Sequence, residues 1–450
     1  MKPTAPTSTS RGLENLPTKM KKFTILFVLV LGFSACKPDS NNPILNRADY
    51  AAYMEAKPQA VNQSYASEEI KFWNQRLEDH PESKQNMMQL AGAYSQRFRE
   101  DGNIDHIHTS DELFKKSLNT ALLDKAGIYR ALTANAITRH SFKEAYALIH
   151  EAIKIGSDQA ANHLLLFDVA MELGFYNEAQ RALELQQQKS HFNYLIRASK
   201  WADHQGDLDR AIDLMEQAFL KKKNDPMLYQ WAKSNLGDMY GHAGRVEDAY
   251  AAYLEVLAVN PEHWRSWQGL AWIAYAHDGD LEEAQRIINY MSGQSQDIQS
   301  FLLKADLASS KGMIEDALRL KSEFYQEASK PKYGQMYNKH LALIEAEDLN
   351  EPAKAIERLN NELKLRETPE IYDVLAWAKL LNGAPEEALI IAESQVKGKT
   401  FEPDALYHMG MIYMANGRKK EAQKLLKEAL EAAFELGPIT TSEIRQTLAD

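Results

Sequence analysis

Apolar and small residues near the C-terminus recur with the period of an α-helix on both sides of a break at Asn416-Gly417. They are Leu406, Met409, Gly410 and Tyr413 before the break, and Ala422, Leu426 and Ala429 after it. Gly410 and Ala422 carry almost no side chain, so the two predicted helices can approach closely there. The pattern therefore predicts a helix-turn-helix hairpin.

The same unit recurs along most of the chain. Its most regular mark is a series of alanines at a nearly constant interval: Ala145, Ala179, Ala211, Ala249, Ala284, Ala317, Ala355, Ala388 and Ala422. Seven of these alanines lie five residues after a glycine: Gly174, Gly206, Gly244, Gly279, Gly312, Gly383 and Gly417. Glycine suits a tight turn between helices, which can require a positive φ.

The order of residue types in this unit resembles the tetratricopeptide repeat (TPR) family, whose period of about 34 residues matches the interval between the alanines. The resemblance covers roughly residues 85–436. It implies an all-α fold, a right-handed TPR superhelix, which is an α-solenoid of helix-turn-helix repeats. We expect an array of about ten TPR or TPR-like units over residues 68–437 and a C-terminal capping helix over 438–450.

The N-terminal residues predict export. Met20-Lys21-Lys22 precede an apolar run from Phe23 to Leu31, in the order typical of a signal peptide. Ser34-Ala35-Cys36 resembles a bacterial lipobox, in which the cysteine is acylated after cleavage. Cys36 is the only cysteine of the chain, so it forms no internal disulfide.

We therefore expect residues 1–35 to be a leader and lipoprotein signal peptide, with the true start at Met20. Cys36 would carry the lipid, and residues 36–67 would form a flexible tether. This predicts a protein lipid-anchored at the bacterial outer membrane, facing either the periplasm or the cell surface.

The net charge and the incompleteness of the catalytic and binding motifs disfavour several classes of function. The chain has a formal net charge of −11, and removal of five basic residues and one acidic residue before Cys36 leaves about −15. Such a body disfavours binding to a phosphate backbone. Asp105, His106 and His108 are too few to predict a metal site, and Gly398-Lys399-Thr400 lacks the rest of a phosphate-binding loop. We expect no catalytic residues, no cofactor and no metal.

The resemblance implies a partner-binding groove on the concave face of the superhelix. The family positions that line this face hold Trp231, Trp272, Tyr275, Trp377, Tyr407, Met411 and Met414. Polar residues at such positions include Lys200, His204, Asp238, Asp306 and Asp373. Core packing between repeats is an alternative use of the same aromatic residues, and the sequence leaves both open.

The predicted function is a membrane-anchored scaffold for protein–protein interaction in the bacterial cell envelope. Two alternatives remain open. One is a glycan-binding lipoprotein of the starch-binding SusD type, since these proteins also contain TPR units. The other is a hydrolase with an unrecognised site.

Overall fold

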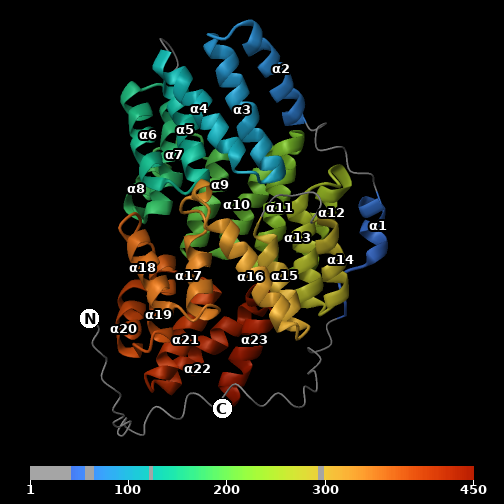
Figure 1. Ribbon diagram of the computed structural model, residues 1–450, viewed down its shortest axis with the longest axis vertical. Coiled ribbons are helices and arrows are strands. Elements are labelled where there is room, and N and C mark those ends of the chain that lie inside the picture. Colours follow the sequence, from blue (N-terminus) through green and yellow to red (C-terminus); the bar gives the residue numbers. More distant parts are fainter. Residues whose placement is uncertain (1–41, 56–64, 121–124, 292–297) are drawn as a thin grey trace, which may run out of the picture. The chain divides into compact units, whose positions relative to one another are not determined.

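The computed structural model describes residues 42–55, 65–120, 125–291 and 298–450. The predicted leader, signal peptide and Cys36 lie outside these residues. Every regular element within them is a helix, as Figure 1 shows. None of the helices in these ranges is both long and apolar enough to cross a lipid bilayer.

The α-helices have the following bounds. They are α1 (Arg47–Glu55), α2 (Tyr65–Asp79), α3 (Lys84–Asp101), α4 (Asp105–Thr120), α5 (Lys125–Thr138), α6 (Phe142–Ile155), α7 (Gln159–Leu173), α8 (Tyr176–Glu184), α9 (Phe192–His204), α10 (Leu208–Lys221), α11 (Pro226–His242), α12 (Val246–Val259), α13 (Trp264–Trp272), α14 (Leu281–Met291), α15 (Ser300–Ser310), α16 (Ile314–Ala328), α17 (Asn338–Glu347), α18 (Pro352–Leu363), α19 (Pro369–Leu381), α20 (Pro385–Ile391), α21 (Pro403–Ala415), α22 (Lys419–Ala429) and α23 (Ala433–Ala449). Short π-helical turns extend α13 (η2, Ile273–His277) and α20 (η4, Ala392–Val396), and 3₁₀ turns lie at η3 (Pro331–Tyr333) and η5 (Leu430–Ala432).

Consecutive helices from α3 to α22 pack in pairs, which gives ten hairpins in the described part of the chain. The turns inside most hairpins contain a glycine with positive φ, such as Gly206 (+79°) and Gly417 (+74°). Close packing inside a hairpin also depends on small residues. A Cβ atom on Gly410 would lie 2.6 Å from the Leu426 side chain, and Ala422 is fully buried. The all-α solenoid predicted from the sequence is confirmed.

The repeats wind back onto themselves, so residues far apart in the sequence are in contact. A Cβ atom on Gly174 would lie 2.4 Å from the Glu367 carbonyl oxygen, and one on Gly206 would lie 2.9 Å from the Phe401 ring. Gly241 lies in the same way against Phe434. In each pair the two residues are a little less than six repeat periods apart in the sequence. One turn of the superhelix therefore holds just under six repeats.

The contact between turns begins at the first hairpin. Ile104 and Ile107, around the start of α4, pack in one apolar cluster with Phe324, Tyr333 and Tyr337. Two polar contacts add to it: His108 Nε2 lies 2.7 Å from the Lys332 carbonyl oxygen, and Lys143 Nζ donates to the Lys364 carbonyl oxygen at 2.6 Å. The segment around residues 102–108, which reads as a polar insertion in the sequence, is thus part of an interface between turns.

Residues 42–55 differ from the flexible tether predicted for 36–67, because they pack on α12, η2 and α14. The backbone N–H groups of Ile44 and Leu45 donate to the two carboxylate oxygens of Asp278 at 3.0 and 2.9 Å. Tyr50 is fully buried, and its hydroxyl donates to Glu283 at 2.6 Å. An apolar face on α1 that contains a tyrosine anchors this part of the predicted tether.

The last helix, α23, is more than the polar cap predicted for residues 438–450. Gly437 breaks it with a φ of +74° and a ψ of 170°, just before Pro438. Beyond the break, Thr441 and Ile444 are buried. The helix contacts α11, η2, α15, α21 and α22, and so joins the two turns of the array (Figure 1).

Candidate partner-binding channel

The C-terminal helix α23 covers much of the predicted groove. Trp377 and Tyr407 belong to one apolar cluster with Leu436 and Ile444 of α23. The Tyr407 hydroxyl donates to Glu443 at 2.8 Å, and Thr447 Oγ1 lies 3.8 Å from the Met411 sulfur. The chain thus covers these positions with its own helix, and here the core-packing alternative that the sequence left open applies.

Several predicted groove residues are consequently core residues. Tyr275, Trp377 and Tyr407 are 2, 7 and 8 % exposed, which favours core packing over an open groove at these three positions. Met411 and Met414 are partly buried and pack against the cluster that contains Trp377. The Trp377 indole N–H donates to Glu347 Oε1 at 2.7 Å, which fixes the ring.

The other two tryptophans differ from each other. Trp231 is 41 % exposed and packs edge-on against Phe192. Trp272 is half-buried, and its indole N–H donates to the Phe434 carbonyl oxygen at 2.9 Å. Of the predicted groove residues, Trp272 lines one of the two cavities described next.

Two neighbouring cavities remain open between the turns. The first, of about 580 Å³, lies between α7–α11 of one turn and the loops before α19 and α21 of the next. The second, of about 730 Å³, is lined by α11, α13, α15, α17 and α23. Both cavities are lined by His242 and Glu435, whose side chains approach to 3.7 Å, so they meet at this pair. We call the two together the channel.

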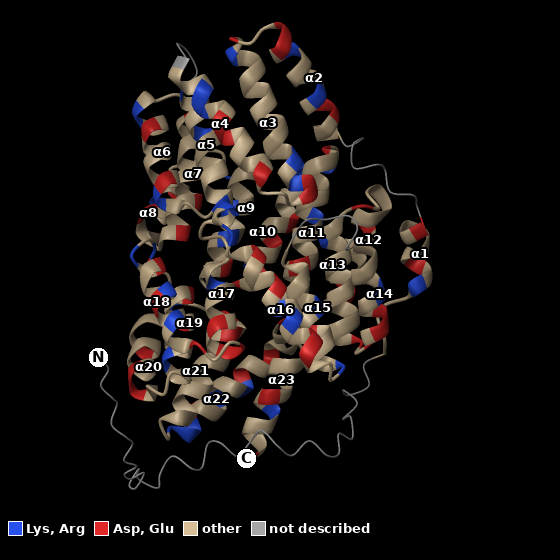
Figure 2. Ribbon diagram, viewed as in Figure 1, with Lys and Arg blue, Asp and Glu red and all other residues tan. Residues whose placement is uncertain are grey.

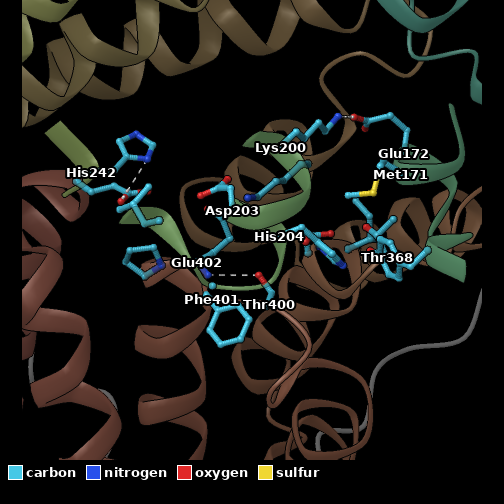
Figure 3. A pocket seen from close by; sticks show the side chains of 18 of the residues that line it. Met171, Glu172, Lys200, Asp203, His204, His242, Thr368, Thr400, Phe401 and Glu402 are labelled. Atoms are coloured by element: carbon cyan, nitrogen blue, oxygen red, sulfur yellow. Dashed lines mark hydrogen bonds and ion pairs between the residues drawn. The ribbon is translucent and has the colours of Figure 1, made fainter. Parts of the chain in front are cut away.

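The first cavity contains more acidic groups than its basic groups neutralise. Figure 3 shows Lys200 turned toward Glu172, which it contacts at 2.8 Å. Although burial opposes ionisation, Lys200 and Arg366 together hold the pKa of Glu172 below its usual value. Asp203 and Glu402, also seen in Figure 3, have no side-chain hydrogen bond or ion pair among the described residues.

These unpaired carboxylates affect one another through the cavity. Burial raises the pKa of Asp203 and of Glu402, although the charge of Lys200 opposes the shift at Asp203 and that of Lys339, also in the lining, opposes it at Glu402. Burial also raises the pKa of Glu435 to about 7, and the nearby charges of Glu402, Asp404 and Asp203 add to the shift although His242 opposes it. A cavity whose carboxylates repel one another favours a cationic ligand.

The second cavity combines aromatic walls with one free carboxylate. Asp238 accepts a hydrogen bond from the Tyr253 hydroxyl at 2.7 Å and one from Arg265 Nε at 2.8 Å, so its charge is compensated. Asp306 lines the same cavity and has no hydrogen bond or ion pair within residues 42–450 as the structure describes them. Trp264 and Trp272 supply aromatic surface.

No group of three or more potential metal ligands occurs in the described ranges. His106 Nε2 contacts Asp101 at 3.1 Å, and His108 serves the contact between turns already described. Basic and acidic residues alternate along the helices without forming one basic stripe (Figure 2).

The polar residues singled out by the repeat register lie in the channel more often than the apolar ones. Lys200 and His204 line the first cavity, and Asp238 and Asp306 line the second. Asp373 does not line either, because it is buried against His408 Nδ1 at 2.8 Å. Sequence reasoning missed Glu402, Glu435 and His242, since they meet only where two turns stack.

Comparison with known families identifies the repeats. Two models of the tetratricopeptide repeat match, one over residues 235–286 and the other over residues 403–435. The chain is a tetratricopeptide repeat protein. Tetratricopeptide repeats are scaffolds for binding other proteins, which supports protein partners for this TPR protein. No curated protein matches its sequence.

Several solved structures are similar to this TPR protein at low identity. PilW, a type IV pilus biogenesis factor, is 15 % identical, with a TM-score of 0.38 over 48 % of this chain and 99 % of its own. PilF of Pseudomonas aeruginosa is 18 % identical, with a TM-score of 0.34 over 47 % and 96 %. A human IFIT1 dimer is 12 % identical, with a TM-score of 0.46 over 81 % and 77 %. These likenesses do not extend to function.

Proposed function

We propose that this TPR protein is a lipid-anchored, non-catalytic scaffold of the bacterial cell envelope and that the channel binds a segment of a partner protein. The observation that carries the proposal is the set of unpaired carboxylates in the channel, Asp203, Glu402 and Asp306. Ionised carboxylates without partners are unfavourable in a partly buried site, so such a site gains stability from a bound cation. The partner segment is therefore basic.

The anchor rests on the sequence. The basic start, apolar run and Ser34-Ala35-Cys36 stand in the order of a lipoprotein signal. In Cys36→Ser the protein should move from the membrane fraction to the soluble fraction, because acyl chains contribute about 0.8 kcal/mol per buried CH₂ group. Unchanged fractionation of this variant in the native bacterium would overturn the anchor and leave the channel untouched.

Site-specific photo-crosslinking tests the channel in cells. A photoreactive amino acid at Thr400, which lines the first cavity, should give discrete crosslinked protein bands. The same group at Glu247, an exposed residue of α12 that lines neither cavity, is the matched control. Bands that are identical at both positions would contradict a partner in the channel.

An oligosaccharide array addresses the glycan alternative with the same protein. A glycan that binds the purified chain and suppresses crosslinking from Thr400 would favour a glycan-binding lipoprotein over a protein scaffold. The scaffold proposal expects no such competition.

A further inference from the structure

We propose that the second cavity is a binding pocket for one arginine or lysine side chain of an extended partner segment, with Asp306 as its counter-charge. The inference deepens the proposed function, because it names the chemical group that the channel recognises. It stands on the lining of the cavity and on the state of each charged group around it.

Of the carboxylates that line this pocket, Asp238 is paired with Arg265 and Glu435 lies 3.7 Å from His242, which leaves Asp306 as the one without an ion pair among the described residues. The nearest cation that acts on it is Lys321, but both oxygens of Asp348 bind the Lys321 ammonium at 2.8 and 2.9 Å. Arg265 is engaged by Asp238 from the opposite wall. Lys321 and Arg265 are thus paired with other carboxylates, so the carboxylate of Asp306 is available to a ligand.

His340 is another polar residue in the lining of this cavity. Its Nδ1 is buried and makes no hydrogen bond within the described residues, and the side chain lines the same cavity. Burial lowers the pKa of His340 to about 4, so the ring is neutral at physiological pH. His340 therefore adds no positive charge to the cavity that would compete with a cationic ligand for Asp306.

The walls suit the aliphatic stem and the cationic head of such a side chain. Trp264, Trp272 and Tyr253 line the cavity together with Leu302 and Leu303. Aromatic rings attract cations through their quadrupole, and leucines pack against methylene groups. The volume of about 730 Å³ accommodates a long side chain with part of its backbone.

The electrostatic state of Asp306 agrees with this assignment. Burial raises the pKa of Asp306 to about 6, with the charges of Asp348 and Glu347 adding and Lys321 opposing. At neutral pH the free protein therefore holds an ionised carboxylate in an unfavourable place. Residues of this kind concentrate at functional sites.

Isothermal titration of the full chain with short peptides tests the pocket. The probe is an acetylated eight-residue peptide of Gly, Ser and Ala with one central arginine, and its twin carries uncharged citrulline instead. We expect the arginine peptide to bind at least tenfold more tightly than the citrulline peptide. Equal affinities, or no binding of either, would overturn the proposal.

Variants localise the effect. Asp306→Asn should reduce the affinity for the arginine peptide to that of the citrulline peptide. Asp306→Ala should have the same effect, and it is the second variant in case the asparagine amide alters the packing of the site. Asp209→Asn removes one exposed carboxylate from α10, outside both cavities, and should leave the affinity unchanged. Wild-type affinity in both Asp306 variants would also overturn the proposal.

Agmatine, a free guanidinium compound, separates a protein side chain from a small amine. If agmatine binds as tightly as the peptide and its binding depends on Asp306, the pocket takes a free amine. The proposal that it takes a side chain of a partner protein is then wrong. This experiment is independent of crosslinking in cells. Binding of the arginine peptide through Asp306 would stand even if crosslinking from Thr400 found no partner.

Discussion

At the scale of single residues, the channel contains a carboxylate, Asp306, whose ionisation is unfavourable in the folded state. Asp306 gains no hydrogen bond or ion pair on folding within the described part of the chain, yet it becomes partly buried. Such a group has a higher pKa in the folded state than in the unfolded state, so the folded state binds more protons in the interval between the two values. Stability must then fall as the pH rises through this interval.

Asp306→Asn should therefore stabilise the protein at neutral pH while weakening its ligand affinity. The shift from 3.8 to about 6 corresponds to about 1–3 kcal/mol at pH 7, once screening by solvent is allowed for. Thermal melting at pH 7 should show a higher Tm for the variant, and most of the difference should be absent near pH 4. A lower Tm at pH 7 would mean that Asp306 has a stabilising partner.

Small residues at the helix crossings limit what each hairpin tolerates. Ala249 is buried in the crossing of α11 and α12, whereas Ala251 in the same helix is exposed. Ala249→Leu should destabilise the protein by about 1–3 kcal/mol through overpacking, measured as a lower Tm. Ala251→Leu has the same change of volume and should melt close to the wild type. Equal melting of both variants would place the repeat register elsewhere.

At the scale of elements, α23 determines which surfaces stay open. Within α23 the chain changes direction at Gly437, whose φ of +74° and ψ of 170° suit glycine alone. A Cβ atom there would lie 3.0 Å from the Trp272 ring. The backbone of Gly437 therefore fixes α23 against the wall of the second cavity.

Gly437→Ala should loosen this contact and lower the Tm. The backbone strain alone is worth about 1–3 kcal/mol, and the contact with Trp272 adds to it. Gly244→Ala is a matched control, because Gly244 also has a positive φ but a Cβ atom there would meet no atom within 4 Å. Differential scanning calorimetry should show a larger loss for Gly437→Ala than for Gly244→Ala. The reverse order would contradict the role given to α23.

At the scale of the repeat array, stacked turns change how stability is shared. In an open solenoid each repeat contacts its neighbours alone, so damage spreads along the sequence. Here Glu172 of α7 contacts Arg366, which belongs to the next turn of the array, at 3.5 Å. A destabilising substitution in one turn should therefore lower the stability of the next turn as well as that of the adjacent repeat.

Gly174→Ala tests this coupling by hydrogen–deuterium exchange. The added methyl group would meet the Glu367 carbonyl oxygen at 2.4 Å, so amide exchange should accelerate in residues 364–371. Gly312→Ala places the same methyl group at a similar positive φ in open space, and exchange in 364–371 should stay unchanged. Exchange that changes only around α7 and α8 in Gly174→Ala would show that the turns are uncoupled.

The same stacking explains how far sequence reasoning reached. Periodic positions such as Ala249 and Gly417 report contacts within a hairpin, so the repeat register and the all-α solenoid could be predicted. The register also placed Asp306 on the inner face. Contacts between turns involve loop residues such as Glu402, which carry no periodic signal. The burial of Trp377 could not be foreseen, because it depends on where α23 lies.

The packing of residues 42–55 limits the length of chain between Cys36 and the folded repeats. A free chain from Cys36 to residue 67 would reach about 110 Å when extended, at about 3.3–3.6 Å per residue. Because Ile44 and Leu45 are held by Asp278, Cys36 is only six positions in the sequence from the first described residue, Asn42, and six residues span at most about 20 Å. A lipid on Cys36, as proposed above, would therefore leave the start of the folded repeats within that distance of the bilayer surface.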